Sequence, residues 1–97
     1  MPHYVSLLHL THKGVENIKD SPKRIDAAKK AIESVGGKLK SFYFTMGQYD
    51  AVTIAEFPSD EAASRLALAS AAQGNVRTET LRAFTEEEYR KIIGSLP

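Results

Sequence analysis

Four residues near the middle of the chain, Gly47-Gln48-Tyr49-Asp50, place a turn former beside a phenolic hydroxyl and a carboxylate. A carboxylate at the mouth of a pocket can act as a general base or bind a ligand amine or hydroxyl, with the tyrosine hydroxyl beside it. The alternative is structural, because turn aspartates accept backbone N–H groups and a tyrosine can pack over a hairpin. Turn chemistry favours the structural interpretation, and Asp50 stays a candidate catalytic residue, with Tyr49 a candidate ligand-binding residue.

A histidine, His9, lies inside an apolar stretch that is typical of a central strand. Imidazole there is a candidate acid–base group or a metal or haem ligand. The alternative is a hydrogen-bonded structural histidine, which is the commoner case for a lone strand histidine. His3 and His12 are near in sequence, but three scattered histidines do not make a metal-site spacing. We therefore keep His9 as a second candidate catalytic residue and predict neither a metal nor another cofactor.

Two cations follow the first strand. Lys13 precedes a glycine, and a lysine with free backbone N–H groups at such a place can bind an anionic ligand group. Arg24, in Ser21-Pro22-Lys23-Arg24, is a candidate to join it. The alternative for both is a solvated surface. We expect Lys13 and Arg24 to be ligand-binding residues.

Hydroxyl groups also recur on strands. Thr78 and Thr80 share one side of the last strand with Arg82, opposite Arg77. These residues are candidates to line a cavity with hydroxyl groups and one guanidinium group, the alternative being cross-strand pairing in an interface. Tyr43 is the candidate pocket residue outside the central motif. RNA-binding domains of related topology also display aromatic residues on a sheet. However, the strand that should carry them, "DAVTIAEF", has no paired aromatics, which argues against RNA binding.

Composition limits the function classes. The chain has 97 residues, 13 Lys plus Arg and 12 Asp plus Glu, which gives a net charge of +1 and no reason to expect a nucleic-acid or membrane-surface partner. It has no cysteine, so thiolate catalysis and thiolate metal sites are excluded. No apolar run approaches a membrane span, and no signal peptide is evident. These features predict one globular domain, residues 1–97, in the cytoplasm.

Periodicity predicts the elements that position these residues. Strands are expected at Tyr4–Thr11, Lys38–Met46, Asp50–Phe57 and Asn75–Phe84, with the middle two forming a hairpin. A helical turn is expected at Val15–Lys19. A helix begins at Ser21-Pro22 and ends at Gly36-Gly37, and a second, alanine-rich helix runs from Ser59 to Gly74. The capping box Thr85-Glu86-Glu87-Glu88 starts a short C-terminal helix that runs to about Ile93.

This order, βαββαβ with a terminal helix, predicts an α+β ferredoxin-like fold with both long helices on one face of an antiparallel sheet. Strand alternation assigns Phe42, Phe44, Val52 and Ile54 to the helix side. The other face is then semi-polar, and a second subunit packed sheet on sheet around a small cavity would explain it. A solvated sheet face is the alternative, and we favour the homodimer.

Four segments carry a family resemblance: "YVSLLHLT", "KG…IKDSPKR", "GGKLKSFYFTMGQYDAV" and "GNVRTETLRAF". Together they resemble the GYD-domain family, whose name matches Gly47, Tyr49 and Asp50 here, and the resemblance covers residues 4 to 84. It implies a dimeric α/β-barrel built from ferredoxin-like subunits, and it implies no particular reaction.

We therefore expect a small cytoplasmic homodimer, or a higher oligomer, that binds a small organic molecule in a sheet-lined cavity. Any chemistry would be cofactor-free proton transfer by Asp50 or His9, and the sequence leaves open whether the protein is an enzyme. The alternative is a non-catalytic assembly or regulatory module whose open sheet face is only an oligomer interface.

Overall fold

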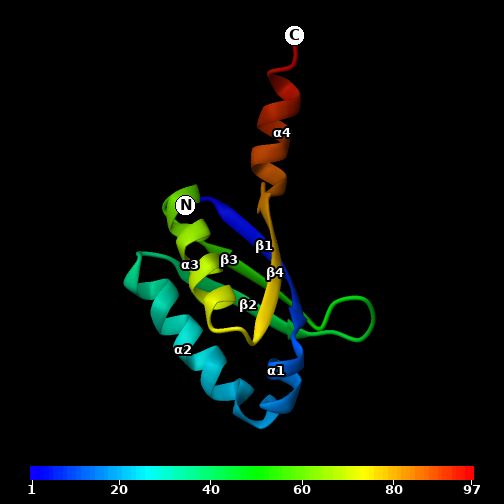
Figure 1. Ribbon diagram of the computed structural model, residues 1–97. Helices are drawn as coiled ribbons and strands as arrows, with labels where there is room; N and C mark the ends of the chain where they lie inside the picture. The colour runs from blue at the N-terminus through cyan, green and yellow to red at the C-terminus, as the bar shows by residue number, and fades with distance from the viewer.

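The computed structural model describes residues 1–97. Four strands and four helices follow one another along the chain, with one 3₁₀ turn, η1 (Figure 1). In chain order they are β1 (His3–Leu10), α1 (His12–Glu16), η1 (Ile18–Asp20), α2 (Ser21–Ser34), β2 (Lys38–Phe44), β3 (Ala51–Glu56), α3 (Asp60–Ala72), β4 (Val76–Ala83) and α4 (Glu86–Gly94). No helix is both long enough and apolar enough to span a membrane.

The four strands form one antiparallel sheet in the order β2-β3-β1-β4. This order is consistent with the predicted ferredoxin-like fold. Helices α2 and α3 cover one face of the sheet, and no element of the chain covers the opposite face (Figure 1). We call that opposite face the open sheet face. Helix α4 projects beyond the end of the sheet (Figure 1).

Local sequence signals explain most helix ends. Ser59 caps α3 by accepting the Ala62 N–H, as predicted. Thr85 and Glu88 form the predicted capping box of α4, in which each side chain accepts the backbone N–H of the other residue. Gly36 ends the α2 region with a φ of 84°, a left-handed conformation that glycine adopts without strain.

Several boundaries differ from the predicted ones. The segment after β1 forms α1 and η1 in place of a single turn at Val15–Lys19. Strand β2 ends at Phe44 and β3 begins at Ala51, so the hairpin loop is longer than the predicted three residues. The loop is closed by the Thr45 N–H, which donates to the Asp50 carbonyl at 2.9 Å. Gly47 lies in this loop with a φ of 124°, a conformation that glycine adopts without strain and that helps the chain to reverse its direction.

The prediction for β3 assigned Val52 and Ile54 to the wrong face. Directly paired residues share a face, and Val52 pairs with Leu7 and Tyr43 while Phe42 pairs with Thr53. Val52 and Ile54 therefore lie on the open sheet face. The helix side receives the small residues of β3 instead.

Small residues on the helix side allow α3 to approach the sheet closely. Ala55 of β3 and Ala62 and Ala63 of α3 are buried together in the core. Tyr4, Ile32 and Phe57 complete this core, and the Tyr4 and Phe57 rings meet edge to face with centroids 5.6 Å apart. All six residues come from the start of β1, the end of β3 and the elements beside them. The core thus fills one end of the space between sheet and helices.

Candidate functional site

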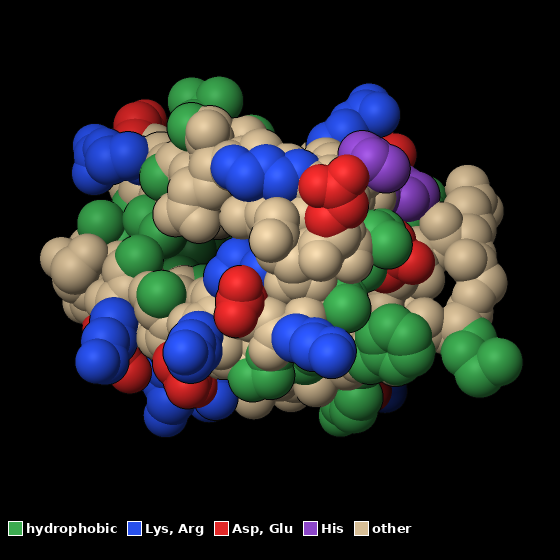
Figure 2. All heavy atoms as spheres, turned by 60° about the horizontal axis from the view of Figure 1, so that its bottom comes forward, with side chains coloured by type: hydrophobic (Ala, Val, Ile, Leu, Met, Phe, Trp, Pro, Cys, Tyr) green, Lys and Arg blue, Asp and Glu red, His purple; other side chains and the backbone are tan.

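A cavity extends along the space between the sheet and helices α2 and α3, from the core residues Ile32, Ala55, Phe57 and Ala63 to Leu10 at the end of β1. Its volume is about 570 Å³, and 19 of its 29 lining residues are hydrophobic. A volume of this size lies within the range of small-molecule sites in proteins. In Figure 2, hydrophobic side chains lie in a hollow between charged side chains at the surface. The cavity thus lies within one subunit, is partly open to solvent, and does not lie between two sheets.

Both layers supply its apolar walls. Phe42 and Phe44 of β2 face the helices, as predicted, and their side chains are incompletely covered, at 38% and 72% exposed. Leu8 of β1 adds to the sheet wall, and Leu66 and Ala67 of α3 form part of the opposite wall. Exposed aromatic surface of this extent inside a concave site favours an apolar ligand body.

Hydroxyl groups from the sheet lie among these apolar side chains. Ser6 Oγ and Thr80 Oγ1 are hydrogen-bonded at 3.0 Å, and Thr53 and Thr78 also line the cavity. Thr78 and Thr80 were predicted to line a cavity on the open sheet face, and that placement is wrong. They pair with Leu8 and Ser6 of β1, whose side chains point toward the helices.

Asp50 is one of the two charged residues that line the cavity. Its Oδ2 accepts a 2.8 Å hydrogen bond from the Leu10 N–H, and its own N–H donates to the Leu8 carbonyl at 2.8 Å. These contacts hold the carboxylate at the end of β1. Asp50 forms no ion pair within the chain. The residue therefore has a structural role at Oδ2 and also presents a negative charge at the cavity.

Arg24 is the other charged lining residue, and it comes from the first turns of α2. Its Nη1 donates to the Asn17 carbonyl at 3.0 Å, while its Nη2 is buried without a hydrogen-bond partner. It also forms no ion pair within the chain. Leu10, Asp50, Ser21 and Arg24 belong to the end of the cavity that lies away from the core. The cavity is thus charged at one end and apolar along its length.

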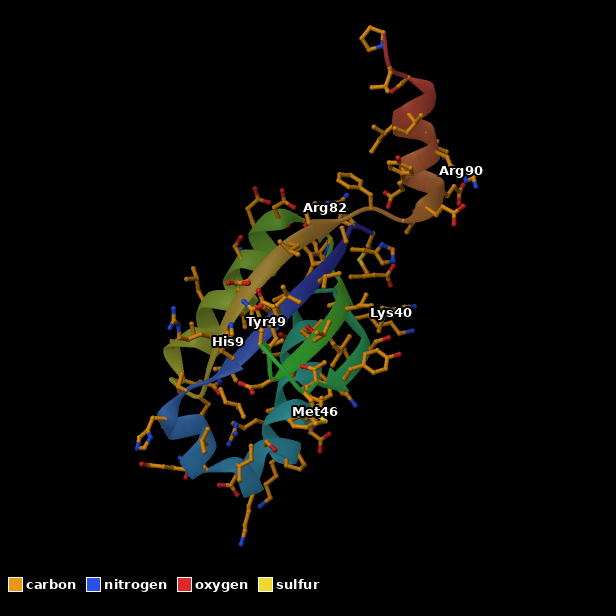
Figure 3. The ribbon with its side chains drawn as sticks, turned by 90° about the vertical axis from the view of Figure 1, so that its right-hand side faces the viewer. His9, Lys40, Met46, Tyr49, Arg82 and Arg90 are labelled. Carbon is orange, nitrogen blue, oxygen red and sulfur yellow. The ribbon has the colours of Figure 1, made fainter.

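The remaining motif residue, Tyr49, lies on the open sheet face and not in this cavity. Its hydroxyl donates to Glu79 Oε2 at 2.9 Å, and its ring lies 4.8 Å from the His9 ring (Figure 3). The hydrogen bond to Glu79 is the main cause that raises the pKa of Tyr49 above its usual value, with burial adding to it. The hairpin loop thereby reaches across β1 to β4. His9 and Asp50, predicted as alternative bases, therefore belong to opposite faces of the sheet.

A polar hollow of about 550 Å³ adjoins His9, and its lining includes Thr11, His12, Arg77 and Glu79. No group of three or more histidine, aspartate or glutamate side chains in the chain is placed to hold a metal ion. His12 contacts Glu16 at 2.6 Å, which is a contact within its own short helix. Tyr43, predicted as a pocket residue, is 61% exposed on the open sheet face.

The other predicted cations are occupied by neighbouring groups. Lys13 Nζ donates to the Gln73 carbonyl at 2.8 Å, and the N–H of Gly14 donates to the Thr11 hydroxyl. Arg82 lies over the Phe84 ring, 4.4 Å from its centroid. Of the predicted ligand-binding residues, Arg24, Thr78 and Thr80 line the large cavity together with Asp50.

Sequence reasoning missed Ser6, Thr53 and the small residues of α3 as cavity residues. The alternation along β1 carried a signal for Ser6, since Ser6 and Leu8 share a side. The signal became decisive only with the strand register, which pairs Ser6 with Thr80 and with Thr53.

Comparison with known proteins establishes the family. The model of the GYD domain matches residues 4–93 of the chain. The chain belongs to the GYD-domain family. Among GYD-domain relatives, a Thermus thermophilus protein described as "glutamine synthetase and cystathionine beta-lyase binding protein" is 32% identical over 85 residues, which cover 87% of this chain and 90% of that protein. A crystal structure of a protein from Thermus thermophilus is similar in fold, with a TM-score of 0.54 and 23% identity over 88% of this chain and 95% of the other.

Proposed function

We propose that this GYD-domain protein binds a small, largely apolar organic molecule in the cavity between its sheet and helices α2 and α3. The observation that carries the proposal is the cavity of about 570 Å³, which is lined mainly by hydrophobic residues and is bordered by two unpaired charges. Part of the apolar lining is exposed, as at Phe42 and Phe44, and contact between apolar surface and water is unfavourable. A ligand bound there would remove that surface from water.

Any proton transfer on such a ligand would use Asp50, because Asp50 lines the cavity and His9 does not. Its Oδ2 is hydrogen-bonded to Leu10, so its other oxygen is the one available to a ligand. Ser6, Thr53 and Thr78 add hydroxyl groups that can orient a ligand.

Filling the cavity tests this proposal. Ala67 lines the cavity on α3, and an Ala67→Leu change would occupy part of its volume. Ala72, near the end of the same helix, is exposed and does not line the cavity, so Ala72→Leu is the matched control. Native mass spectrometry of freshly purified protein should show a retained small molecule on the parent and the control, and less on Ala67→Leu. Equal retention on all three proteins would refute the proposal.

A second candidate function, binding of another protein, is supported by the open sheet face. Tyr43 and Leu81 are 61% and 53% exposed there, and Val52 and Ile54 lie between their strands on the same face. The Thermus thermophilus relative is described as a protein that binds two other proteins, which supports a protein-binding role for this chain.

The first partner that we propose for this face is a second copy of the chain. An isologous dimer uses one self-complementary patch, and two open sheet faces packed together would bury the exposed apolar side chains of both. Helix α4 supports the same proposal, because Tyr89, Ile92 and Ile93 are 58%, 42% and 46% exposed on a helix of nine residues. Helices of that length are marginal in water without a packing partner.

Light scattering during size-exclusion chromatography tests the dimer. Leu81→Glu places a charge within the proposed interface, whereas Leu68→Glu places it on α3, where Leu68 is 71% exposed. We expect a dimer for the parent and for Leu68→Glu, and a monomer for Leu81→Glu. A monomeric parent at all accessible concentrations would exclude the homodimer and leave the face to a different protein.

A further inference from the structure

We propose that the ligand of the cavity is a small zwitterion of the apolar amino-acid class, whose carboxylate meets Arg24, whose ammonium group meets Asp50 and whose side chain lies against Phe42 and Phe44. This inference rests on the proposed function, because it names the chemistry of a molecule bound in the same cavity. It follows from the two charges that the chain itself leaves without counter-ions.

Arg24 supplies the cationic half of the site. A guanidinium group has five N–H donors, and its usual partner in a partly buried place is a carboxylate. Here its one acceptor is the Asn17 carbonyl on Nη1, while Nη2 is buried and unsatisfied. Nη2 is not accessible to solvent, so a ligand carboxylate would reach the group after a rotation of the guanidinium. A buried unsatisfied donor costs free energy that a ligand carboxylate would recover.

Asp50 supplies the anionic half. Its Oδ2 is held by the Leu10 N–H, which orients the carboxylate without neutralising it. No cation of the chain pairs with it. A ligand that carried only an anionic group would bring a second negative charge toward this carboxylate, and a ligand that carried only an ammonium group would meet the positive charge of Arg24. A ligand with both groups balances both charges.

The rest of the cavity is suited to an apolar side chain. Phe42, Phe44, Leu8 and Leu66 line it, and further along the cavity the lining includes the core residues Ile32 and Phe57. An apolar group placed there would be removed from water, at about 25 cal/mol for each Å² of buried area. The arrangement therefore suits a molecule that carries an ammonium group and a carboxylate at one end and an apolar side chain at the other.

Isothermal titration calorimetry on the full-length protein, with four probes of one shape, tests the inference. The probes are L-phenylalanine, 3-phenylpropanoate, 2-phenylethylamine and 2-phenylethanol, which carry both charges, the negative charge, the positive charge and neither. We expect L-phenylalanine to bind most tightly and each loss of a charged group to weaken binding about tenfold or more, as expected for charged hydrogen bonds.

Two conservative variants assign the charges. Arg24→Gln should remove the advantage that the carboxylate confers, and Asp50→Asn should remove the advantage of the ammonium group while retaining an oxygen for the Leu10 N–H. Lys23→Gln and Asp26→Asn make the same charge changes at exposed positions of α2 and should change nothing. Circular dichroism spectra that match the parent show that each variant is folded.

Equal binding of all four probes would overturn the inference but leave the proposed function intact, because the cavity would then select only apolar shape. Tighter binding of the singly charged probes than of L-phenylalanine would also overturn it. Binding of none of the four probes to a protein that retains another small molecule would overturn the amino-acid assignment alone. Binding of none, with no retained molecule, would overturn both.

Discussion

The backbone N–H of Leu10 donates a 2.8 Å hydrogen bond to Oδ2 of Asp50, just beyond the last β1–β3 pair, Leu8 with Ala51. The carboxylate thus accepts a hydrogen bond from a backbone N–H group of β1 beyond the last residue that pairs with β3. The same residue borders the cavity between the sheet and helices α2 and α3. The Asp50 side chain therefore both holds the end of β1 and is the proposed contact for a ligand.

This contact predicts a graded loss of stability at Asp50. Asp50→Ala leaves the Leu10 N–H without its acceptor, and we expect the free energy of unfolding to fall by about 1–3 kcal/mol. Asp50→Asn retains an acceptor oxygen and should cost less. Urea denaturation measures both, and Asp26→Ala, on the exposed face of α2, is the control. A loss for Asp50→Ala no greater than that of the control would contradict the structural role.

The hydrogen bond from Tyr49 to Glu79 predicts a shifted phenol titration. Because Glu79 accepts from the neutral hydroxyl, the pKa of Tyr49 is raised above its usual value of 10.0 in the folded protein. The stabilisation is therefore fully present at neutral pH and is lost as the pH rises through the folded-state pKa. Ultraviolet difference titration of the parent against Tyr49→Phe isolates this tyrosine. Glu79→Gln should shift its pKa downward, and an unchanged titration would exclude the contact.

A close backbone approach predicts that Gly14 is sensitive to substitution. A Cβ atom at this position would lie 2.1 Å from the Asn75 carbonyl oxygen, and backbone cannot rotate away as a side chain can. We expect Gly14→Ala to lower the free energy of unfolding by about 1–3 kcal/mol. Gly94→Ala is the matched control, because no atom lies within 4 Å of its Cβ position and alanine is favoured over glycine in a helix by up to about 1 kcal/mol. Equal thermal stability of the two variants would contradict the clash.

The capping box predicts a pH dependence of α4. The Thr85 N–H donates to the Glu88 carboxylate, and this hydrogen bond is the main cause that lowers the pKa of Glu88 below its usual value of 4.5. A lowered folded-state pKa means that the contribution is present above the unfolded-state value and is lost as the pH falls through the folded-state value. The helical signal in circular dichroism should therefore decline in that acidic range. Glu88→Gln, which can still accept the hydrogen bond, should weaken this decline; an identical acid profile for both proteins would refute it.

The sequence by itself determined the features that depend on residues close together in the chain. The caps at Ser59 and Thr85, the break at Gly36 and the β2–β3 hairpin follow from local hydrogen bonding and backbone freedom. The order of elements then led to the sheet order and to the placement of both long helices on one face, because few connections between such elements are sterically allowed.

Only the tertiary structure decided which side of each strand faces the helices. Alternation along β3 shows that Val52 and Ile54 lie opposite Ala51, Thr53 and Ala55, but it does not show which set faces the helices. The choice depends on how closely alanine-rich α3 packs on the sheet and on a register shift in β2 between Leu39 and Ser41. A shift of one residue in the register of a strand moves all of its side chains to the opposite face of the sheet.

For the candidate site too, the sequence identified individual residues and the tertiary structure decided which of them lie together. Asp50, Arg24, Thr78 and Thr80 were identified as candidates from residue type and position, since charged and hydroxyl groups beside strands and turns are chemically suggestive. Their gathering on the helix side, and the separation of Asp50 from His9 by the thickness of the sheet, came from pairings between segments distant in the chain. Such pairings depend on how the whole sheet packs against the helices, and a short stretch of sequence does not specify that packing.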